Sequence, residues 1–507
     1  MRTLIALTAL LLAGCALKTP PTPDQVLTQA LPSQTKLPPQ WTADPLPGTP
    51  VPDGWLKTFN DPALEAIVAE AIAYNPDLRA AASRVDVAQQ LVVLAGAQLQ
   101  PQVGAVVGGR TIEDSGSSGV FNSSQAYASV GWEIDVWGRL RAQQAAAQAG
   151  YDASALDFAF ARQSLAALTA RVWYATVESR QLLVLAEQAV QTYTELLRLV
   201  KIRRGAGRVA DLDVAESSAN LAAAQATLQG EREAYAAARR ALEVLVGRYP
   251  AAQVEVATAF GPLPPQTSAG LPATLLERRP DLIGAEREVV AAFRKQEAAE
   301  LALLPDFSLG LSGGRFSDGL LSLLRLNPWL ATATIGISIP IYTGGALQAQ
   351  VQIATAQQAR AVASYGAVAL KAFREVEDAL AAEQFLALRV PYQRDSMTQR
   401  DEALRIAYVQ YRAGRIDLLW VSQLQAKQIA AAAELVRLAG TQMANRIKLQ
   451  LALGSSFDAL PAAGGSPAPQ GSPLNTSQRS PDRPIQRSVG NVRELAESDE
   501  PVKDGVL

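Results

Sequence analysis

The chain has 507 residues, with 46 Lys and Arg against 48 Asp and Glu, no histidine and one cysteine. A formal net charge of -2 leaves no basic excess for phosphates, so we expect no nucleic-acid partner. Without histidine, Ser-His-Asp and Cys-His catalysis and histidine metal ligation are excluded, and one cysteine excludes an internal disulfide and a cysteine-based zinc cluster. We therefore expect no enzyme, no cofactor and no metal site.

The first residues have the pattern of a secretory signal peptide. Arg2 precedes an apolar run, Leu4 to Leu12, that is too short to cross a bilayer as a helix. The run leads into LAGC, with the cysteine at position 15, which resembles a bacterial lipobox. This resemblance implies cleavage before Cys15 and its acylation, and Ala16 in place of the usual retention residue Asp implies sorting to the outer membrane. An ordinary signal peptide with a chance cysteine is the alternative.

Residues 15–54 are rich in proline, which predicts an extended tether without helix. The folded part opens at about Trp55. Asp61 before Pro62 is a helix start signal, and we expect helices from Pro62 to Tyr74 and from Asn75 to Pro101.

Four segments then alternate apolar with small or polar residues, the pattern of strands with one apolar face. They are Gln102–Arg110, Ser129–Val136, Asp306–Gly313 and Ala331–Ile341, with a polar loop over 111–124. In the second, Glu133 and Asp135 fall on the polar face. A tilted strand of about nine to eleven residues can cross a bilayer. A soluble sheet with one wet face is the alternative.

Long helical segments follow each strand pair. We expect a helix over 142–203 that returns from an Asp211 cap to Gly247, and a second over 347–413, with a bend near Pro391, that returns over 417–454. Glycines at 138 and 344–345 separate strand from helix, and glycines at 207 and 414 separate each helix from its return.

The same order of helices and strands is predicted twice along the chain. Pro76 matches Pro280, a shift of 280 − 76 = 204, and Gly207 matches Gly414, a shift of 414 − 207 = 207. We divide the chain into a signal peptide (1–14), a lipidated tether (15–54), a first repeat (55–250), a linker (251–271), a second repeat (272–454) and a disordered tail (455–507).

Four strands cannot close a barrel, and open strand edges are not tolerated in lipid. If these strands span a membrane, several chains must share one barrel. Three chains would supply twelve strands, which leave an aqueous lumen lined by Gly, Ser and Thr.

Several ordered motifs resemble the TolC-like outer-membrane efflux proteins, most closely their NodT-type lipoprotein branch. They are WLKTFNDPAL from Trp55, NPDL from Asn75, WEIDVWGRL from Trp132, RRPDL from Arg278, PIYTGG from Pro340 and YRAG from Tyr411. The resemblance covers about Trp55 to Gly454.

The resemblance implies a mostly α fold with a membrane β-barrel: a homotrimer with a twelve-stranded barrel above a periplasmic helical tunnel. It implies a passive exit duct in the outer membrane of a Gram-negative bacterium, lipid-anchored and spanning, which extends into the periplasm. Its partners would be outer-membrane lipid, a periplasmic adaptor (membrane fusion) protein and an inner-membrane pump of the RND type. No nucleic acid is expected.

The resemblance also implies where function lies. The helix turns would form the periplasmic tip that contacts the adaptor and gates the channel; the residues there are Gly207, Arg208, Asp211, Tyr411, Gly414, Arg415, Asp417 and Gln423. Barrel would join tunnel at Trp137, Gly138, Gly344 and Gly345. Relatives often carry an acidic residue at position 423 and Arg at 426, whereas this chain has Gln423 and Ala426, which puts a charge-pair gate there in doubt. Helix capping and solvation are the plainer reading of the charges near the turns.

Two alternatives stay open. One is a structural periplasmic coiled-coil lipoprotein with a soluble sheet, and the other is the exit duct of a type I protein secretion system. A hydrolase has no support, because the glycines at 205, 207, 344 and 345 are isolated and form no phosphate-binding loop.

Overall fold

The computed structural model describes residues 17–43, 51–113, 120–317 and 330–458. The chain divides into two compact units, Met1–Leu460 and Pro461–Leu507, and the elements below belong to the first. Cys15, the predicted acylation site, and residues 459–507 of the expected tail lie outside the described residues.

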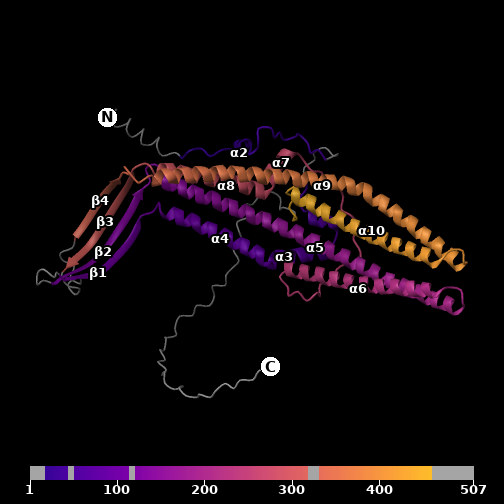
Figure 1. Ribbon diagram of the computed structural model, residues 1–507. Helices are drawn as coiled ribbons and strands as arrows, with labels where there is room; N and C mark the ends of the chain where they lie inside the picture. Colours follow the sequence, from indigo (N-terminus) through magenta and orange to yellow (C-terminus); the bar gives the residue numbers. More distant parts are fainter. Residues whose placement is uncertain (1–16, 44–50, 114–119, 318–329, 459–507) are drawn as a thin grey trace, which may run out of the picture. The chain divides into compact units, whose positions relative to one another are not determined.

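Two copies of one series of elements make up this unit (Figure 1). The first is α4 (Pro76–Ala97), β1 (Gln102–Glu113), β2 (Val120–Ile134), α5 (Arg139–Gly205) and α6 (Asp211–Leu245). The second is α8 (Pro280–Leu301), β3 (Asp306–Ser317), β4 (Leu330–Ser338), α9 (Ala346–Arg412) and α10 (Leu418–Ala452). Paired helices have equal lengths of 22, 67 and 35 residues. Their starts differ by 280 − 76 = 204 and 346 − 139 = 207, so the predicted duplication is confirmed.

Shorter elements precede each copy, and some of them begin at a side-chain cap. These shorter elements are α2 (Pro23–Ala30), η1 (Trp55–Phe59), α3 (Pro62–Tyr74) and α7 (Pro272–Arg278). The Asp61 carboxylate accepts hydrogen bonds from the first N–H groups of α3, and Asn75 does the same for α4. These bonds satisfy donors that a helix leaves unpaired in its first turn. α9 runs on through Pro391 to Arg412, so this proline does not end the helix.

The sheet is antiparallel in the order β1-β2-β3-β4. Its first hairpin is longer than predicted, because Thr111–Glu113 pair with Val120–Asn122, residues that the sequence placed in a loop. Once two strands are in register, the backbone ladder continues into the ends of this stretch, although the stretch as a whole has the composition of a polar Gly/Ser loop. β4 is shorter than predicted and ends at Ser338 rather than at Ile341.

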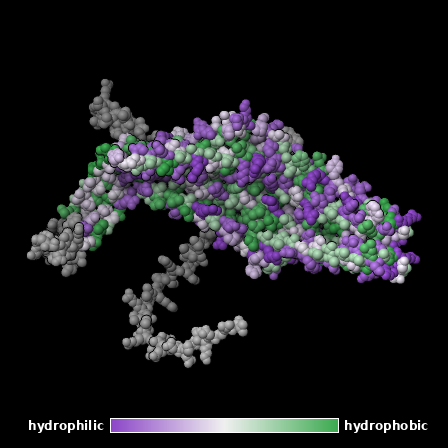
Figure 2. Space-filling model, viewed as in Figure 1, coloured by the Kyte–Doolittle hydropathy of each residue, from purple (hydrophilic) through white to green (hydrophobic). Residues whose placement is uncertain are grey.

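The register places most of the apolar residues of the four strands on one face. Val103 pairs with Val130, Val130 with Leu311, and Leu311 with Ala333. Between them, Ser129 pairs with Ser312 on the opposite face. Val103, Leu311 and Ile335 of the apolar face are exposed in the single chain, and Figure 2 shows hydrophobic residues at the surface of the strands.

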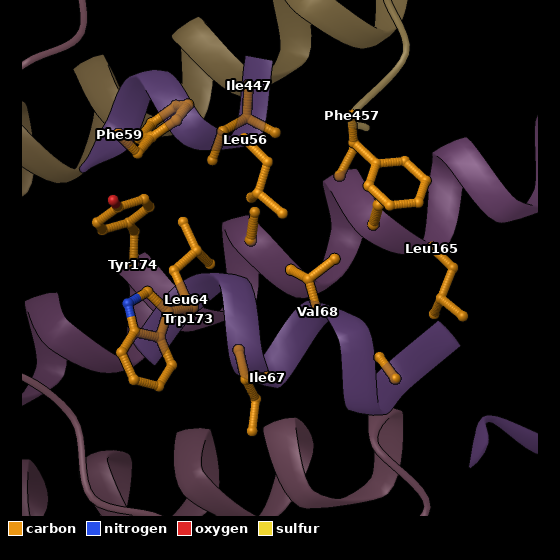
Figure 3. Packing of buried hydrophobic residues seen from close by; sticks show 14 of the residues in the cluster. Leu56, Phe59, Leu64, Ile67, Val68, Leu165, Trp173, Tyr174, Ile447 and Phe457 are labelled. Carbon is orange, nitrogen blue, oxygen red and sulfur yellow. The ribbon is translucent and has the colours of Figure 1, made fainter. Parts of the chain in front are cut away.

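The helices form a row in the order α4, α5, α8 and α9, each packed against the next (Figure 1). α6 packs on α5, and α10 packs on α9 and α5. Figure 3 shows part of the largest core cluster, in which Leu64 and Val68 of α3 meet Trp173 of α5 and Ile447 of α10. This packing ties the two repeats into one unit.

The N-terminal strap, residues 17–43, differs from the expected extended tether because it contains α2. Thr22 forms a capping box with Gln25, and Pro23 occupies the first helical position, where a missing N–H does no harm. Val26 is fully buried beside residues of α8 and α9, and Trp41 is buried in a second cluster. The proline-rich composition predicted no helix here, because composition carries no information about the surface of α8 and α9 on which α2 packs.

The chain also stays packed slightly beyond the second repeat, where the tail was expected to begin at 455. The Ser455 hydroxyl donates to the Pro52 carbonyl at 2.5 Å, and the Ser456 N–H donates to Asp53 at 2.9 Å. Phe457 is buried in the largest core cluster. These contacts hold the segment up to residue 458 against the start of the first repeat.

Candidate functional site: two joints and two helix turns

The first joint between strand and helix is fixed by side chains. Gly138 has a φ of +88°, which turns the chain from β2 into α5 and which only glycine adopts readily. The Asp135 carboxylate accepts hydrogen bonds from the N–H groups of Leu140 and Arg141, at 3.1 and 3.0 Å. Asp135 thus caps α5 and also pairs with the Arg141 side chain. The sequence placed it on the polar strand face, but β2 ends at Ile134, and the free N–H groups of the helix bind the carboxylate.

Two more side chains tie this joint to the second repeat. The Trp137 Nε1 donates to the Pro305 carbonyl at 2.8 Å. Arg139 donates to Glu133 at 2.5 Å and lies 3.7 Å from the Asp306 carboxylate. The start of α5 is therefore anchored to both β2 and the start of β3.

The second joint has the same backbone with little side-chain support. Gly344 and Gly345 have φ values of +63° and +85°, and α9 starts without a side-chain cap. Ile341 and Tyr342 are almost fully exposed. Tyr342 stands at the position of Asp135 (135 + 207 = 342), so the capping group of the first joint has no equivalent here.

The first helix turn is mostly exposed, but Val209 packs against an apolar cluster that contains residues of the second repeat. Gly207 has a φ of +70°, and the Arg208 N–H donates to the Arg203 carbonyl at 2.9 Å, which closes the end of α5. The N-cap of α6 is Ala210, not Asp211 as predicted. Asp211 is the first helical residue and pairs with Arg204, and this hydrogen bond and the charge of Arg204 lower the pKa of the exposed Asp211.

The second turn repeats this backbone around different side chains. Gly414 has a φ of +71°, and the Arg415 N–H donates to the Gln410 carbonyl at 2.9 Å. Asp417 is the N-cap of α10 but makes no side-chain cap bond. Tyr411 is only 2% exposed, and burial raises the pKa of its hydroxyl.

Arg203 joins the two turns. Its guanidinium lies 4.1 Å from the centre of the Tyr411 ring and donates to the carbonyls of Tyr411 and Arg412, at 3.1 and 3.2 Å. Tyr411 also belongs to an apolar cluster with Val200 of α5 and Leu418 and Val421 of α10. The structure therefore brings the predicted Tyr411 together with Arg203 and Val200 of the first repeat, which the sequence did not single out, at one end of the long helices.

Other predicted tip residues do not join this cluster. Arg208, Arg415, Asp417 and Gln423 are exposed, as is Ala426. Sequence reasoning missed Arg203 and Asp135. A basic residue in the last turn of a helix is so common that Arg203 carried no signal of a contact with another helix. The DVWG stretch, an acid shortly before a helix start, could have pointed to Asp135 as a cap.

In the described ranges no group of three or more acidic or cysteine side chains is placed to hold a metal ion. No helix in those same ranges combines the length and the apolar character needed to cross a membrane.

Comparison with known proteins identifies this arrangement. The family model described as outer membrane efflux protein matches residues 67–248 and 271–455, one match on each repeat. The chain belongs to the outer membrane efflux protein family. It is thus an efflux channel component of the outer membrane of Gram-negative bacteria, in a family of channels rather than enzymes.

Two curated relatives and one solved structure show the extent of this similarity. The pyoverdine export outer membrane protein OpmQ of Pseudomonas putida is 31% identical over 464 residues, which cover 89% of this chain and 96% of OpmQ. The toluene efflux pump outer membrane protein TtgC of Pseudomonas putida is 28% identical over 464 residues, which cover 89% and 95%. The open-state outer membrane channel MtrE of Neisseria gonorrhoeae has the same fold, with a TM-score of 0.75 and 24% identity over 88% of this chain and 99% of MtrE.

Proposed function

We propose that three copies of this efflux channel protein form one exit duct, a twelve-stranded barrel above a helical tunnel. The observation that carries this is the sheet: four strands with a continuous exposed apolar face and two unpaired edges, β1 and β4. An open edge in lipid leaves backbone N–H and C=O groups without partners, at several kcal/mol each. Copies that pair β4 with the next β1 remove every edge.

In this assembly the two faces of the sheet would contact different media. The face with Val130 and Leu311 would contact lipid, and the face with Ser129 and Ser312 would line an aqueous lumen. Gly, Ser and Thr on the inner face leave the lumen open because they do not fill it. The duct would be a passive conduit driven by its pump.

We further propose that the two helix turns form the periplasmic tip. α5 has 67 residues, so Gly207 lies ~100 Å along the helix from Gly138. A groove between α5, α6 and α10 is lined in part by small side chains, among them Ala223, Ala224 and Ala430. Small residues allow close approach of another helix, which supports docking of the adaptor here and, through it, an inner-membrane RND pump.

The residues of the two turns named above would gate this tip. Because Gln423 and Ala426 are uncharged, we propose that the closed state depends on the Arg203–Tyr411 contact and the apolar cluster beneath it. Gly207 and Gly414 would let the chain turn, while exposed Arg208, Asp211, Arg415 and Asp417 would meet the adaptor.

We also propose that Cys15 is acylated and adds a lipid anchor. Leu17 lies beside Gly138, so a lipid two residues earlier would enter the membrane near the joint. The names of relatives of similar identity mention pyoverdine and toluene, two chemically different cargoes. We infer that the pump, rather than the duct, selects the cargo.

The test is insertion and conductance of the full chain. Val130→Arg should reduce the fraction inserted in the outer membrane and its conductance in planar bilayers at least tenfold, because it puts a charge in lipid. Ser129→Arg, one residue away on the lumen face, should still insert. Equal loss from both substitutions would contradict the faces, and a chain that never conducts, even with Arg203→Ala to loosen the tip, would contradict the duct.

A further inference from the structure

The linker between the repeats, residues 251–271, crosses the long helices. It leaves α6 and packs on α5, where the ring of Phe260 lies 6.3 Å from the ring of Tyr174. Thr258 and Val436 of α10 line one groove, and Ala269 is buried in an apolar cluster with residues of α9. The two ends of the linker thus lie on α6 and on α9, and α6 itself packs chiefly on α5.

The first end of the linker is fastened to α6 by a buried carboxylate. Glu243, which is 2% exposed, accepts hydrogen bonds from three successive N–H groups, at 2.7, 2.5 and 3.0 Å. These N–H groups belong to Ala252, Gln253 and Val254. One turn earlier on α6, Arg239 donates to the Val254 carbonyl at 2.7 Å. Hydrogen bonds to an ionised group are among the stronger ones, so this end is firmly held.

The equivalent positions of α10 hold the second end less well. The counterparts of Arg239 and Glu243, 207 residues later, are Arg446 and Gln450. The Gln450 Nε2 donates to the Thr267 hydroxyl at 2.7 Å. The Gln450 Oε1 and the Nε and Nη1 of Arg446 are buried and make no hydrogen bond with any residue that the structure describes. Buried polar atoms without partners oppose burial, so α10 alone holds this end weakly.

The strap supplies a contact that α10 lacks. Trp41, which is 4% exposed, donates from its Nε1 to the Ala269 carbonyl at 3.0 Å. Its ring lies 6.2 Å from the ring of Phe373 of α9, and it belongs to the same apolar cluster as Ala269. The Glu377 carboxylate of α9 accepts hydrogen bonds from the two N–H groups that follow Trp41, at 2.8 and 3.0 Å. Trp41 therefore joins the second end of the linker to α9.

We propose that docking of the strap fastens the second end of the linker, with Trp41 as the positioning residue, so that the linker ties α6 to α9 only while the strap is bound. Strap and linker stabilise each other, because each buries the contact surface of the other. In the duct proposed above, this tie limits how far the long helices separate, and that consequence rests on the proposed function.

Limited proteolysis of the full chain tests the proposal, because the rate of cutting follows the population of the opened segment. Elastase cuts after small residues and reports on both ends of the linker, after exposed Ala257 and after buried Ala269. Trp41→Ala should raise the rate of cutting after Ala269 about tenfold or more and leave cutting after Ala257 unchanged. An equal rise at both ends, or no rise after Ala269, would overturn the inference.

Two further substitutions serve as controls. Trp41→Phe keeps a ring in the apolar cluster but loses the hydrogen bond, so cutting after Ala269 should rise less than in Trp41→Ala. If Trp41→Ala fails to fold, Trp41→Phe is compared with the native chain instead. Glu243→Gln weakens the three bonds at the first end and should speed cutting after Ala257 only. A similar rise after Ala269 would show that the linker opens as one piece, against the proposal.

A double substitution asks whether the strap and α10 hold the same segment. Gln450→Ala alone should speed cutting after Ala269, though less than Trp41→Ala does. Added to Trp41→Ala, it should have little further effect, because the end is already released. Effects of the two substitutions that simply multiply would mean that Trp41 does not fasten this end, and would overturn the inference.

Conductance separates this inference from the proposed duct. Trp41→Ala should raise the open fraction in planar bilayers about threefold or more, since the long helices are then free to separate further. A released linker end with an unchanged open fraction would overturn the limit on separation. A chain that elastase cuts as expected but that never conducts would contradict the duct and leave the role of Trp41 intact.

Discussion

The two helix turns share one backbone conformation but differ in the side chains that surround it. Gly207 and Gly414 have φ values of +70° and +71°, and the same N–H to C=O bond closes each helix. At equivalent positions, however, the first turn has Arg204 and Asp211, an exposed ion pair, and the second has Tyr411 and Leu418, both buried. Glycine and local hydrogen bonds form the turn in either case. The side chains decide whether it stands in water or packs onto its neighbour.

Removal of the buried side chain should have the largest effect. Tyr411→Ala leaves a cavity under both turns and should destabilise this end of the long helices by about 3 to 5 kcal/mol. Amide hydrogen exchange over 408–421 would then rise more than about 100-fold. Arg204→Ala, at the equivalent position of the first turn, should barely change exchange there, because an exposed pair contributes little. Similar effects at both turns would remove the distinction.

The contact between the turns should rank second. Arg203→Ala loses two hydrogen bonds to carbonyls and the contact with the Tyr411 ring, about 2 kcal/mol in total. We expect faster exchange at residues 411–416 and a higher open fraction in planar bilayers. Gln410→Ala is the matched control, because Gln410 occupies the equivalent position of α9 and is exposed. If it opened the tip as much, Arg203 would have no special role.

The two repeats also differ at the other end of these helices, where the first repeat, not the second, has the stabilising side-chain contacts. Asp135→Ala removes the cap of α5 and its bond with Arg141, and should cost about 1 to 2 kcal/mol. Exchange of the first amides of α5 should rise, and trypsin should cut sooner at Arg139 or Arg141. Tyr342→Ala, the equivalent change at the uncapped second joint, should leave the start of α9 as it was. A matching rise there would show that capping does not distinguish the joints.

The smallest effect should be a response of the first turn to acid. Arg204 lowers the pKa of Asp211, so the pair stabilises the folded turn above the usual carboxyl pKa, about 3.9, and is lost as pH falls through the lower folded value. Exchange at 204–212, corrected for its intrinsic pH dependence, should rise once the pH falls below the usual carboxyl pKa. Tyr411 and Leu418 carry no group that titrates there, and Asp417 makes no side-chain cap bond that acid could break, so 411–418 should not respond in this way. Asp211→Asn should abolish the response of the first turn.

Much of the fold could be predicted because its signals are local. The alternation in Asp306–Gly313 and the glycines at 138, 207, 345 and 414 depend on a few neighbouring residues, and the structure has strands and turns there. The errors have one physical cause. Three features were missed: the strand residues Thr111–Glu113, the strap helix α2 and the cap Asp135. Each takes its conformation from contacts with residues outside the segment used to judge it, either a few positions away or far along the sequence.

The sequence by itself determined the duplication, the lengths of the long helices and the places where the chain turns. Each depends on periodicity, on glycine or on a repeated motif, and these act within one or two turns of helix. Only the tertiary structure decided which side of each element is covered. Val87 and Ala291 occupy the same position of the repeated unit, yet one is exposed and the other buried, because α8 has a second helix beside it and α4 has none in the described chain. Burial depends on the neighbour, and a neighbour far along the sequence is found only when the chain has folded.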